Sequence, residues 1–268
     1  MRTAIASILL GLVLAAALLA PAWPHDRALA TKDAGHLFPS IKQRVVAAWS
    51  EGGLPTWQLE VGCGGPLLAD PMAQALYPPD LAFVGTDPLT GMKRFVALHV
   101  VLLVAGFAAL ARRRGVRPIV ALAAALAWVG SGPVLSQHWS VLWMGGLVGL
   151  LAALLGLEAL VGERRRAAAV PWLVGGLVWM VLAGAYEVVV GFGVWAALAL
   201  AAEGVALRRA ACRPLVRFGV AAVLAAGLAA IQLLPTAELR ALSNRAHGLP
   251  LEQAAFWSLP PVRLLELV

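Results

Sequence analysis

Charged residues are scarce in this sequence: only 13% of its 268 residues are Asp, Glu, Lys or Arg, while 61% are hydrophobic. Soluble domains carry about a quarter of charged residues, so the scarcity argues against a soluble globular protein. The apolar residues gather in nearly uncharged blocks of about 15–25 residues, the length that a helix needs to cross a bilayer. These blocks lack the strict alternation of barrel strands. We therefore expect an all-α, polytopic transmembrane protein, because helices then satisfy the backbone in lipid.

Several catalytic motifs are also missing. The sequence has no P-loop, no GxSxG, no HExxH and no CxxC. These absences argue against the nucleotide-dependent, serine-hydrolase and zinc-protease chemistries that such motifs mark. The only cysteines are Cys63 and Cys212, which we expect on opposite sides of the membrane. No disulfide framework, metal-ligand spacing or resident cofactor is therefore indicated.

The apolar blocks predict about seven spans in one transmembrane domain that covers residues 1–268. The spans are expected at about 3–23, 95–111, 118–134, 139–161, 171–186, 188–207 and 218–234. A long loop (24–93) and a C-terminal segment (235–268) are too polar to span. The first block could also be a signal peptide cleaved near Ala22, but its length favours a retained helix.

The basic residues indicate the orientation. The net charge is +7, which in a soluble protein would suggest nucleic acid. Here the arginines form short clusters after the second, fourth and sixth blocks, on the same side as Arg2. By the positive-inside rule this side is cytoplasmic, and the loop 24–93 and the C-terminal segment lie outside. We expect membrane lipids as partners and no nucleic acid.

The long loop contains one amphipathic stretch. Ile41, Val45, Ala48 and Trp49 recur at helical spacing, while residues 42–44 (Lys, Gln, Arg) are placed on the other side. Gly52-Gly53 would stop this helix. We expect it to lie on the membrane surface.

Two polar residues follow the first span, Asp33 and His36. At helical spacing they would share one face. A carboxylate near the outer membrane face could act as a general base for an acceptor hydroxyl. The structural alternative is that Asp33 caps the helix that follows.

Other polar groups are predicted on the same side of the membrane. The Gly62–Pro66 run needs unusual backbone angles, for a ligand or for a tight surface turn. Asp70-Pro71 is best interpreted as a signal for a turn or a helix start, and a catalytic role for the Asp70 carboxylate is the second interpretation. Trp57 and Tyr77 could stack on sugars or simply lie at the interface. Further groups that could join a site, or be ordinary solvated loop residues, are His138, Glu187 and Arg245.

The order of these motifs resembles that of one family. After a first span come Asp33-x-x-His36, Gly52-x-Leu54-Pro55-x-Trp57, Gly64-x-Pro66-Leu67-Leu68-Ala69-Asp70-Pro71 and Tyr77-Pro78-Pro79. The later part adds Gln232-Leu233-Leu234-Pro235-Thr236, Ser243-Asn244-Arg245 and Ser258-Leu259-Pro260-Pro261. Over essentially its whole length the chain resembles the YfhO-like bacterial membrane proteins of the GT-C glycosyltransferase superfamily.

The resemblance implies an enzyme of the bacterial inner membrane. Such an enzyme moves a sugar from a polyprenyl-phosphate-linked donor to an envelope glycan, lipid or protein acceptor on the outer face. Superfamily members carry an essential Asp in the first outer loop, so the resemblance implies that Asp33 is catalytic. Arg245 would suit a lipid phosphate. The remaining substrate-binding candidates are His36, Trp57, Asp70, Tyr77, His138 and Glu187.

The sequence departs from the family in two ways. Trp57-Gln58-Leu59 stands where members often have Trp-Asn-Pro, and members are usually much longer. The last residues, 265–268, are mostly apolar, with no polar tail. We therefore expect an N-terminal portion of a longer protein, active only in the longer form.

Two other functions fit the same composition. A transporter or flippase for a lipid-linked sugar would need polar groups along a path through the spans, and the predicted spans are nearly free of charge. A non-catalytic envelope assembly protein would tolerate the loss of Asp33, whereas the enzyme would not.

Overall fold

The structure, a computed structural model, describes residues 2–24, 27–29, 32–60, 62–161, 168–207, 212–244, 246–256 and 262. These residues are mostly helical, with a single two-stranded sheet among them. The all-α prediction is therefore confirmed for this part of the chain. Arg245, the arginines at 164–166 and 208–209, and the predicted motif at 258–261 lie outside the described residues.

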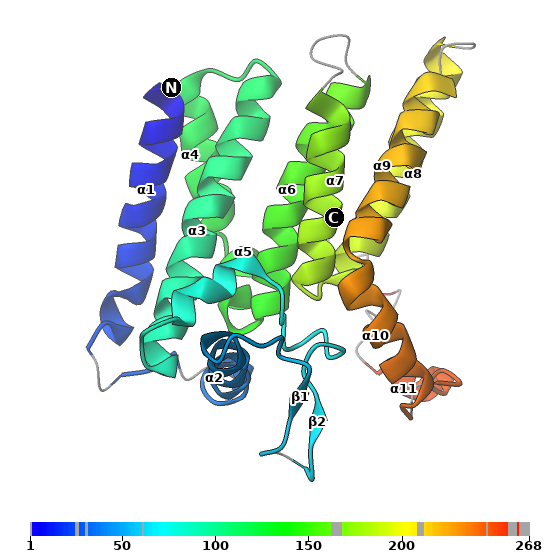
Figure 1. Cartoon of the computed structure of the whole chain (residues 1–268). Helices are drawn as coiled ribbons and strands as arrows, with labels where there is room; N and C mark the ends of the chain where they lie inside the picture. The colour runs from blue at the N-terminus through cyan, green and yellow to red at the C-terminus, as the bar shows by residue number, and fades with distance from the viewer. Residues whose placement is uncertain are drawn as a thin grey trace.

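Long helices run side by side and form a bundle (Figure 1). Its members are α1 (Arg2–Leu19), α3 (Pro88–Arg113), α4 (Pro118–Val129), α6 (Val141–Val161), α7 (Ala169–Leu182), α8 (Tyr186–Leu207) and α9 (Cys212–Leu228). The N-terminus and the arginines at 112–114 lie at one end, which we call the arginine end. The opposite end is called the loop end.

The loop end is built from short elements (Figure 1). From residues 20–83 come η1 (Ala20–Ala22), η2 (Lys32–Ala34), α2 (Leu37–Ser50), β1 (Trp57–Gln58), β2 (Gly65–Pro66) and η3 (Pro78–Phe83). Later segments add α5 (Gly132–Leu135), η4 (Ser136–Trp139), α10 (Ala230–Ala241) and α11 (Leu251–Ala254). The long loop and the C-terminal elements thus gather at one end of an apolar bundle, opposite the arginine end.

Three helices of the described chain, α1, α3 and α6, are each long and apolar enough to cross a membrane. Two bent pairs bring the number to at most five if each pair is one span: α4 with the Gly132–His138 segment, bent by 55°, and α9 with α10, bent by 73°. Helices α7 and α8 are apolar but shorter. The described chain thus has three to five apolar helices that could span a membrane, as the membrane class requires, and the count of seven spans remains a prediction.

Helix α3 begins earlier than the predicted span at 95. The Asp87 carboxylate accepts a hydrogen bond from the backbone N–H of Thr90 (2.9 Å), and Pro88 follows at the first helical position. Both features start a helix. The helix ends with Arg112 and Arg113 in its last turn, where cations complement the helix dipole. The predicted loop 24–93 therefore ends inside the first turns of α3.

Helices α6 and α7 form the closest pair of the bundle because glycines face each other. A Cβ added to Gly149 would lie 2.9 Å from the Gly176 carbonyl, and one added to Gly176 would lie 2.5 Å from the Ala153 nitrogen. Gly156 packs as tightly on Leu173. Small residues let membrane helices approach at the backbone, where dispersion contacts replace the missing hydrophobic force.

Helix α2 confirms the amphipathic prediction, but its buried face differs from the predicted one. Ile41 and Val45 are buried as expected. Lys42, predicted on the polar side, is fully buried, and α2 packs against α3 and η3. The prediction for Lys42 was wrong because its partners come from residues 73–80, which the local pattern cannot show.

Candidate functional site

Asp33, the predicted catalytic residue, lies at the loop end in η2 and is half-buried. It does not cap α2: the N-cap position belongs to His36, which is exposed and makes no side-chain cap. Asp33 and His36 therefore lie on different elements and share no helix face. The capping alternative for Asp33 is wrong in this structure, and its carboxylate has no hydrogen bond or ion pair among the residues that the structure describes.

The structure brings the Asp33 turn next to the His138 turn, since η2 contacts η4. His138 is half-buried, and its Nδ1 lies 2.7 Å from the Leu135 carbonyl. A hydrogen bond of Nδ1–H to this carbonyl leaves Nε2 as the free ring nitrogen. A carboxylate and an imidazole are thus placed on adjacent turns, although they are far apart in the sequence.

An apolar cavity adjoins the His138 turn. Its volume is about 370 Å³, within the roughly 300–1,000 Å³ range of ligand sites. Leucine and valine side chains from α1, α3 and α5 form most of its wall, with Met144 of α6. Ser136 and His138 supply polar groups. The cavity is therefore suited to an apolar chain whose polar end lies near η4.

Of the other predicted residues, two are exposed. Trp57 is 57% exposed and packs over Gly64, and Glu187 lies exposed in the first turn of α8. The Gly62–Pro66 run is a hairpin turn, in which Gly62, Cys63 and Gly64 all have positive φ. The unusual backbone angles expected there are confirmed. These residues belong to the connection from β1 to β2 and to β2 itself. The Arg44 guanidinium on α2 donates a hydrogen bond to Gln58 Oε1 (2.9 Å), which holds the hairpin against α2.

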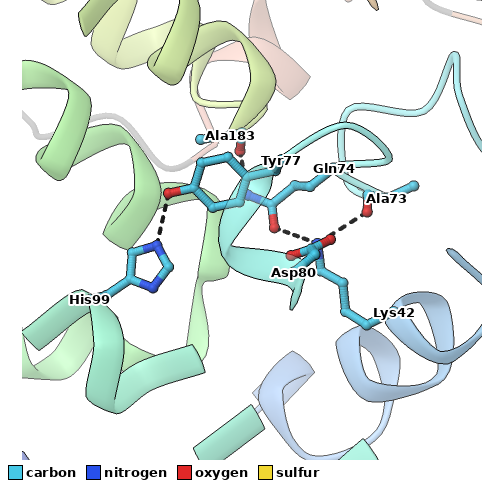
Figure 2. A network of polar contacts seen from close by, with 7 residues as sticks. All are labelled: Lys42, Ala73, Gln74, Tyr77, Asp80, His99 and Ala183. Atoms are coloured by element: carbon cyan, nitrogen blue, oxygen red, sulfur yellow. Dashed lines mark hydrogen bonds and ion pairs between the residues drawn. The ribbon is translucent and has the colours of Figure 1, made fainter. Parts of the chain in front are cut away.

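A fully buried polar cluster lies beneath α2 (Figure 2). We call Lys42, Gln74 and Asp80 the lysine cluster. The Lys42 ammonium donates to Asp80 Oδ2 (2.6 Å), to Gln74 Oε1 (2.6 Å) and to the Ala73 carbonyl (3.0 Å). All three N–H groups of the ammonium are satisfied. Gln74 Nε2 continues the cluster by donating to the Ala183 carbonyl (2.7 Å), which joins the loop to the end of α7.

Burial shifts the titration of this pair. It raises the pKa of the Asp80 carboxyl to about 6, even though Lys42 opposes the shift. It also lowers the pKa of the Lys42 ammonium, against the stabilising charge of Asp80. Both shifts have the sign that desolvation imposes on the charged forms. The ion pair is therefore costly to bury, and its geometry holds the loop in one arrangement.

Tyr77 is fully buried, which leaves no face of its ring for a sugar. Its hydroxyl lies 2.8 Å from Nε2 of His99 on α3 (Figure 2). His99 Nδ1 lies 2.8 Å from the Phe95 carbonyl. The Tyr77 ring meets Trp179 of α7 edge-on. Burial raises the pKa of Tyr77, so its hydroxyl stays protonated. Tyr77 thus links the loop to two helices.

A second polar cluster lies where the loop, α8 and α10 meet. We call Asp70, Tyr186, Gln232 and Thr236 the Asp70 cluster. Gln232 Nε2 donates to the Leu68 carbonyl (2.5 Å), and the Thr236 hydroxyl donates to the Ala69 carbonyl (2.9 Å). Asp70 Oδ1 accepts the Met72 N–H (2.9 Å) in a side-chain turn, so its turn role is confirmed.

Several polar atoms of the Asp70 cluster have unused hydrogen-bonding capacity. Gln232 is 1% exposed, yet its Oε1 has no partner among the described residues. The Tyr186 hydroxyl is buried near Asp70 and within reach of the Thr236 side chain, and it makes no hydrogen bond of good geometry within that part of the chain. Burial raises the pKa of Asp70, while Lys42 pulls it down. Buried groups of this kind are rare in stable proteins and call for an explanation.

Sequence reasoning missed Lys42, Gln74, Asp80, Tyr186 and Gln232 as parts of polar clusters. One signal was available for Lys42: Phe38 and Val45, spaced around it by four and three residues, are apolar and share its helix face. For Gln232 the available signal was a polar residue inside an apolar block. Neither signal names the partner.

No protein-family model matches the chain, and the comparisons with curated proteins and with solved structures find no match either. Within the described residues, no three or more His, Cys, Asp or Glu side chains gather as a metal site. Function must therefore be argued from the residues themselves and from the resemblance of the loop motifs.

Proposed function

We propose that this protein is a membrane glycosyltransferase of the GT-C type, YfhO-like, or the portion of one that binds the lipid-linked donor. The observation that carries the proposal is the position of the Asp33 and His138 turns beside an apolar cavity at the loop end. A lipid-linked sugar needs an apolar site for its chain and a polar site for its head, and the cavity with η2 and η4 offers both.

The residues support a direct transfer. The prenyl chain of the donor occupies the cavity, and its phosphate and sugar lie toward η2 and η4. An acceptor hydroxyl attacks the anomeric carbon while the bond from this carbon to the phosphate oxygen breaks. The phosphate leaves with the bonding electron pair, and Asp33 takes the hydroxyl proton as general base. His138 Nε2 is placed to hydrogen-bond the head group.

Transport across the bundle is less favoured by the same residues. A path for a polar substrate would need free polar groups along the spans. His99 is an ionisable residue inside α3, but both of its ring nitrogens are engaged, by Tyr77 and by the Phe95 carbonyl. The polar groups with unused capacity lie at the loop end, where they favour chemistry at one membrane face.

The test is Asp33→Asn in the intact host gene, including any downstream coding sequence, with the envelope glycans compared by mass spectrometry. Loss of a general base lowers the rate by about 10²–10⁴-fold, so the modified glycan should nearly vanish. The matched control is Glu51→Gln, which removes an exposed carboxylate from the same loop. Membrane levels of both variants are measured by immunoblot.

Two results would decide against the proposal. Unchanged glycans in Asp33→Asn, in a strain where deletion of the gene changes them, would exclude Asp33 as the base. An equal loss in Glu51→Gln would show that the effect comes from the charge of the loop rather than from the Asp33 site.

A further inference from the structure

The Asp70 cluster lies apart from the Asp33 site. Met144 lines the apolar cavity, whereas its neighbour Gly145 packs on Tyr77 and Ala183, toward the Asp70 side. The first turns of α6 thus stand between the cavity and the turn that follows α7.

Two of the three donor groups of the Asp70 cluster are already engaged, and the Tyr186 hydroxyl is the third. Gln232 Nε2 donates a hydrogen bond to the Leu68 carbonyl, and the Thr236 hydroxyl donates one to the Ala69 carbonyl. Because a carbonyl accepts only from a donor, the bond to Leu68 also fixes the orientation of the Gln232 amide, and Oε1 is the free atom. What remains is the capacity to accept at Gln232 Oε1 and at the Tyr186 oxygen, with the half-buried Asp70 carboxylate near Tyr186.

The unused donors and acceptors of the Asp70 cluster indicate which class of ligand could bind there. A phosphate or carboxylate would need several donors, and only the Tyr186 hydroxyl can donate. A cation is disfavoured because the Lys42 ammonium is close enough to act on the Asp70 charge. A ligand that is neutral and donates hydrogen bonds meets both conditions, and alcohol hydroxyls have this chemistry.

We propose that Asp70, Tyr186 and Gln232 form a binding site for the hydroxyl groups of a neutral polyhydroxylated ligand. The ligand hydroxyls donate to Asp70 and to Gln232 Oε1, and the Tyr186 hydroxyl bonds a further ligand oxygen. The site is separate from Asp33, and hydroxyl binding there does not require the protein to be a transferase. In a transferase it would position the acceptor glycan.

The position of the cluster adds a consequence for the fold. Gln232 and Thr236 lie on α10, which bends away from α9 by 73° and is held on residues 68–69. A ligand bound there contacts the loop, α8 and α10 at once. Occupancy of the site would therefore hold the three segments together.

The experiment uses the full chain in lipid nanodiscs and methyl β-D-glucopyranoside as the probe, with saturation-transfer NMR as the readout. Tyr186→Phe removes one hydroxyl that has no partner among the described residues, and we expect about tenfold weaker probe binding, the value of one hydrogen bond to a ligand. Asp70→Asn keeps the oxygen that accepts the Met72 N–H and removes the charge, and it should weaken binding about ten- to a hundredfold.

The matched control is Tyr77→Phe, the same substitution at the other buried tyrosine, whose hydroxyl is engaged by His99; it should bind the probe as the wild type does. Wild-type binding of the probe, lost in Tyr186→Phe and kept in Tyr77→Phe, supports the site. Absence of wild-type binding, or competition by inorganic phosphate or methylammonium, overturns it. An Asp33→Asn variant that loses glycan transfer yet binds the probe would separate this proposal from the proposed function.

Discussion

The lysine cluster and the Asp70 cluster both lie at the loop end, and they use their polar atoms differently. In the lysine cluster every N–H of the Lys42 ammonium meets an acceptor inside the protein. In the Asp70 cluster Gln232 Nε2 and the Thr236 hydroxyl are engaged, while Gln232 Oε1 and the Tyr186 hydroxyl have no partner in the part of the chain that the structure describes. The lysine cluster also has an unused acceptor, since Asp80 Oδ1 is buried without a partner among the described residues. The two clusters therefore differ in their donors: every N–H of Lys42 is used, whereas the Tyr186 hydroxyl is not. An unused buried polar group costs stability unless a ligand engages it.

The largest effect on stability is expected when the cation of the lysine cluster, the Lys42 ammonium, is removed. Lys42→Met leaves Asp80 buried without its partner, so we expect a loss of about 3–5 kcal/mol in the free energy of unfolding. The change is measured by denaturant unfolding in detergent micelles. The double variant Lys42→Met/Asp80→Leu should recover most of the loss, because no buried charge then remains. A single variant as stable as wild type would show that the ion pair does not hold the loop.

The pH dependence of stability sharpens the contrast further. Burial raises the pKa of Asp80 to about 6 from its ordinary value near 4. The folded state therefore keeps a proton that the unfolded state has lost between these pH values. The stability that the protonated Asp80 carboxyl contributes is therefore complete below about pH 4 and declines as the pH rises through 6. The unfolding midpoint of the wild type, relative to Asp80→Asn, should fall across this window, and a flat difference would contradict the burial of the carboxyl.

A third prediction concerns the turn that joins the two clusters. Gly184 has φ +70°, and a Cβ there would lie 2.4 Å from the Pro71 carbonyl. Gly184→Ala should cost about 2 kcal/mol, from the left-handed backbone and from the shift of Pro71. The matched control is Gly175→Ala, at an open position in α7. Thermal unfolding distinguishes the two, and an equal effect in both would mean that the loop is not seated on this turn.

Much of the helical frame was predictable from the sequence because its signals are local. Asp87-Pro88 starts α3, Pro118 starts α4, and Gly184 separates α7 from α8. The clusters were not predictable, because their partners are distant in sequence. Lys42 bonds Asp80 across 38 residues, and Gln232 bonds Leu68 across 164. Periodicity shows which face is buried, but it does not show which loop carbonyl will meet a buried amide.

The smallest expected effect is also the most direct comparison, since this sequence has only two tyrosines. Tyr77→Phe removes a hydroxyl that is engaged with His99, and the His99 nitrogen left behind is buried. We expect a loss of about 1 kcal/mol. Tyr186→Phe removes a buried hydroxyl without a partner, so stability should stay within about 0.5 kcal/mol of wild type or rise slightly.

Both variants keep the ring and differ from wild type by one oxygen, so packing is nearly constant and thermal unfolding in the same detergent compares them. Equal losses in the two would mean that Tyr186 is as well bonded as Tyr77, and the Asp70 cluster would then be structural. A loss in Tyr77→Phe alone would leave ligand binding as the reason to keep a buried hydroxyl at Tyr186.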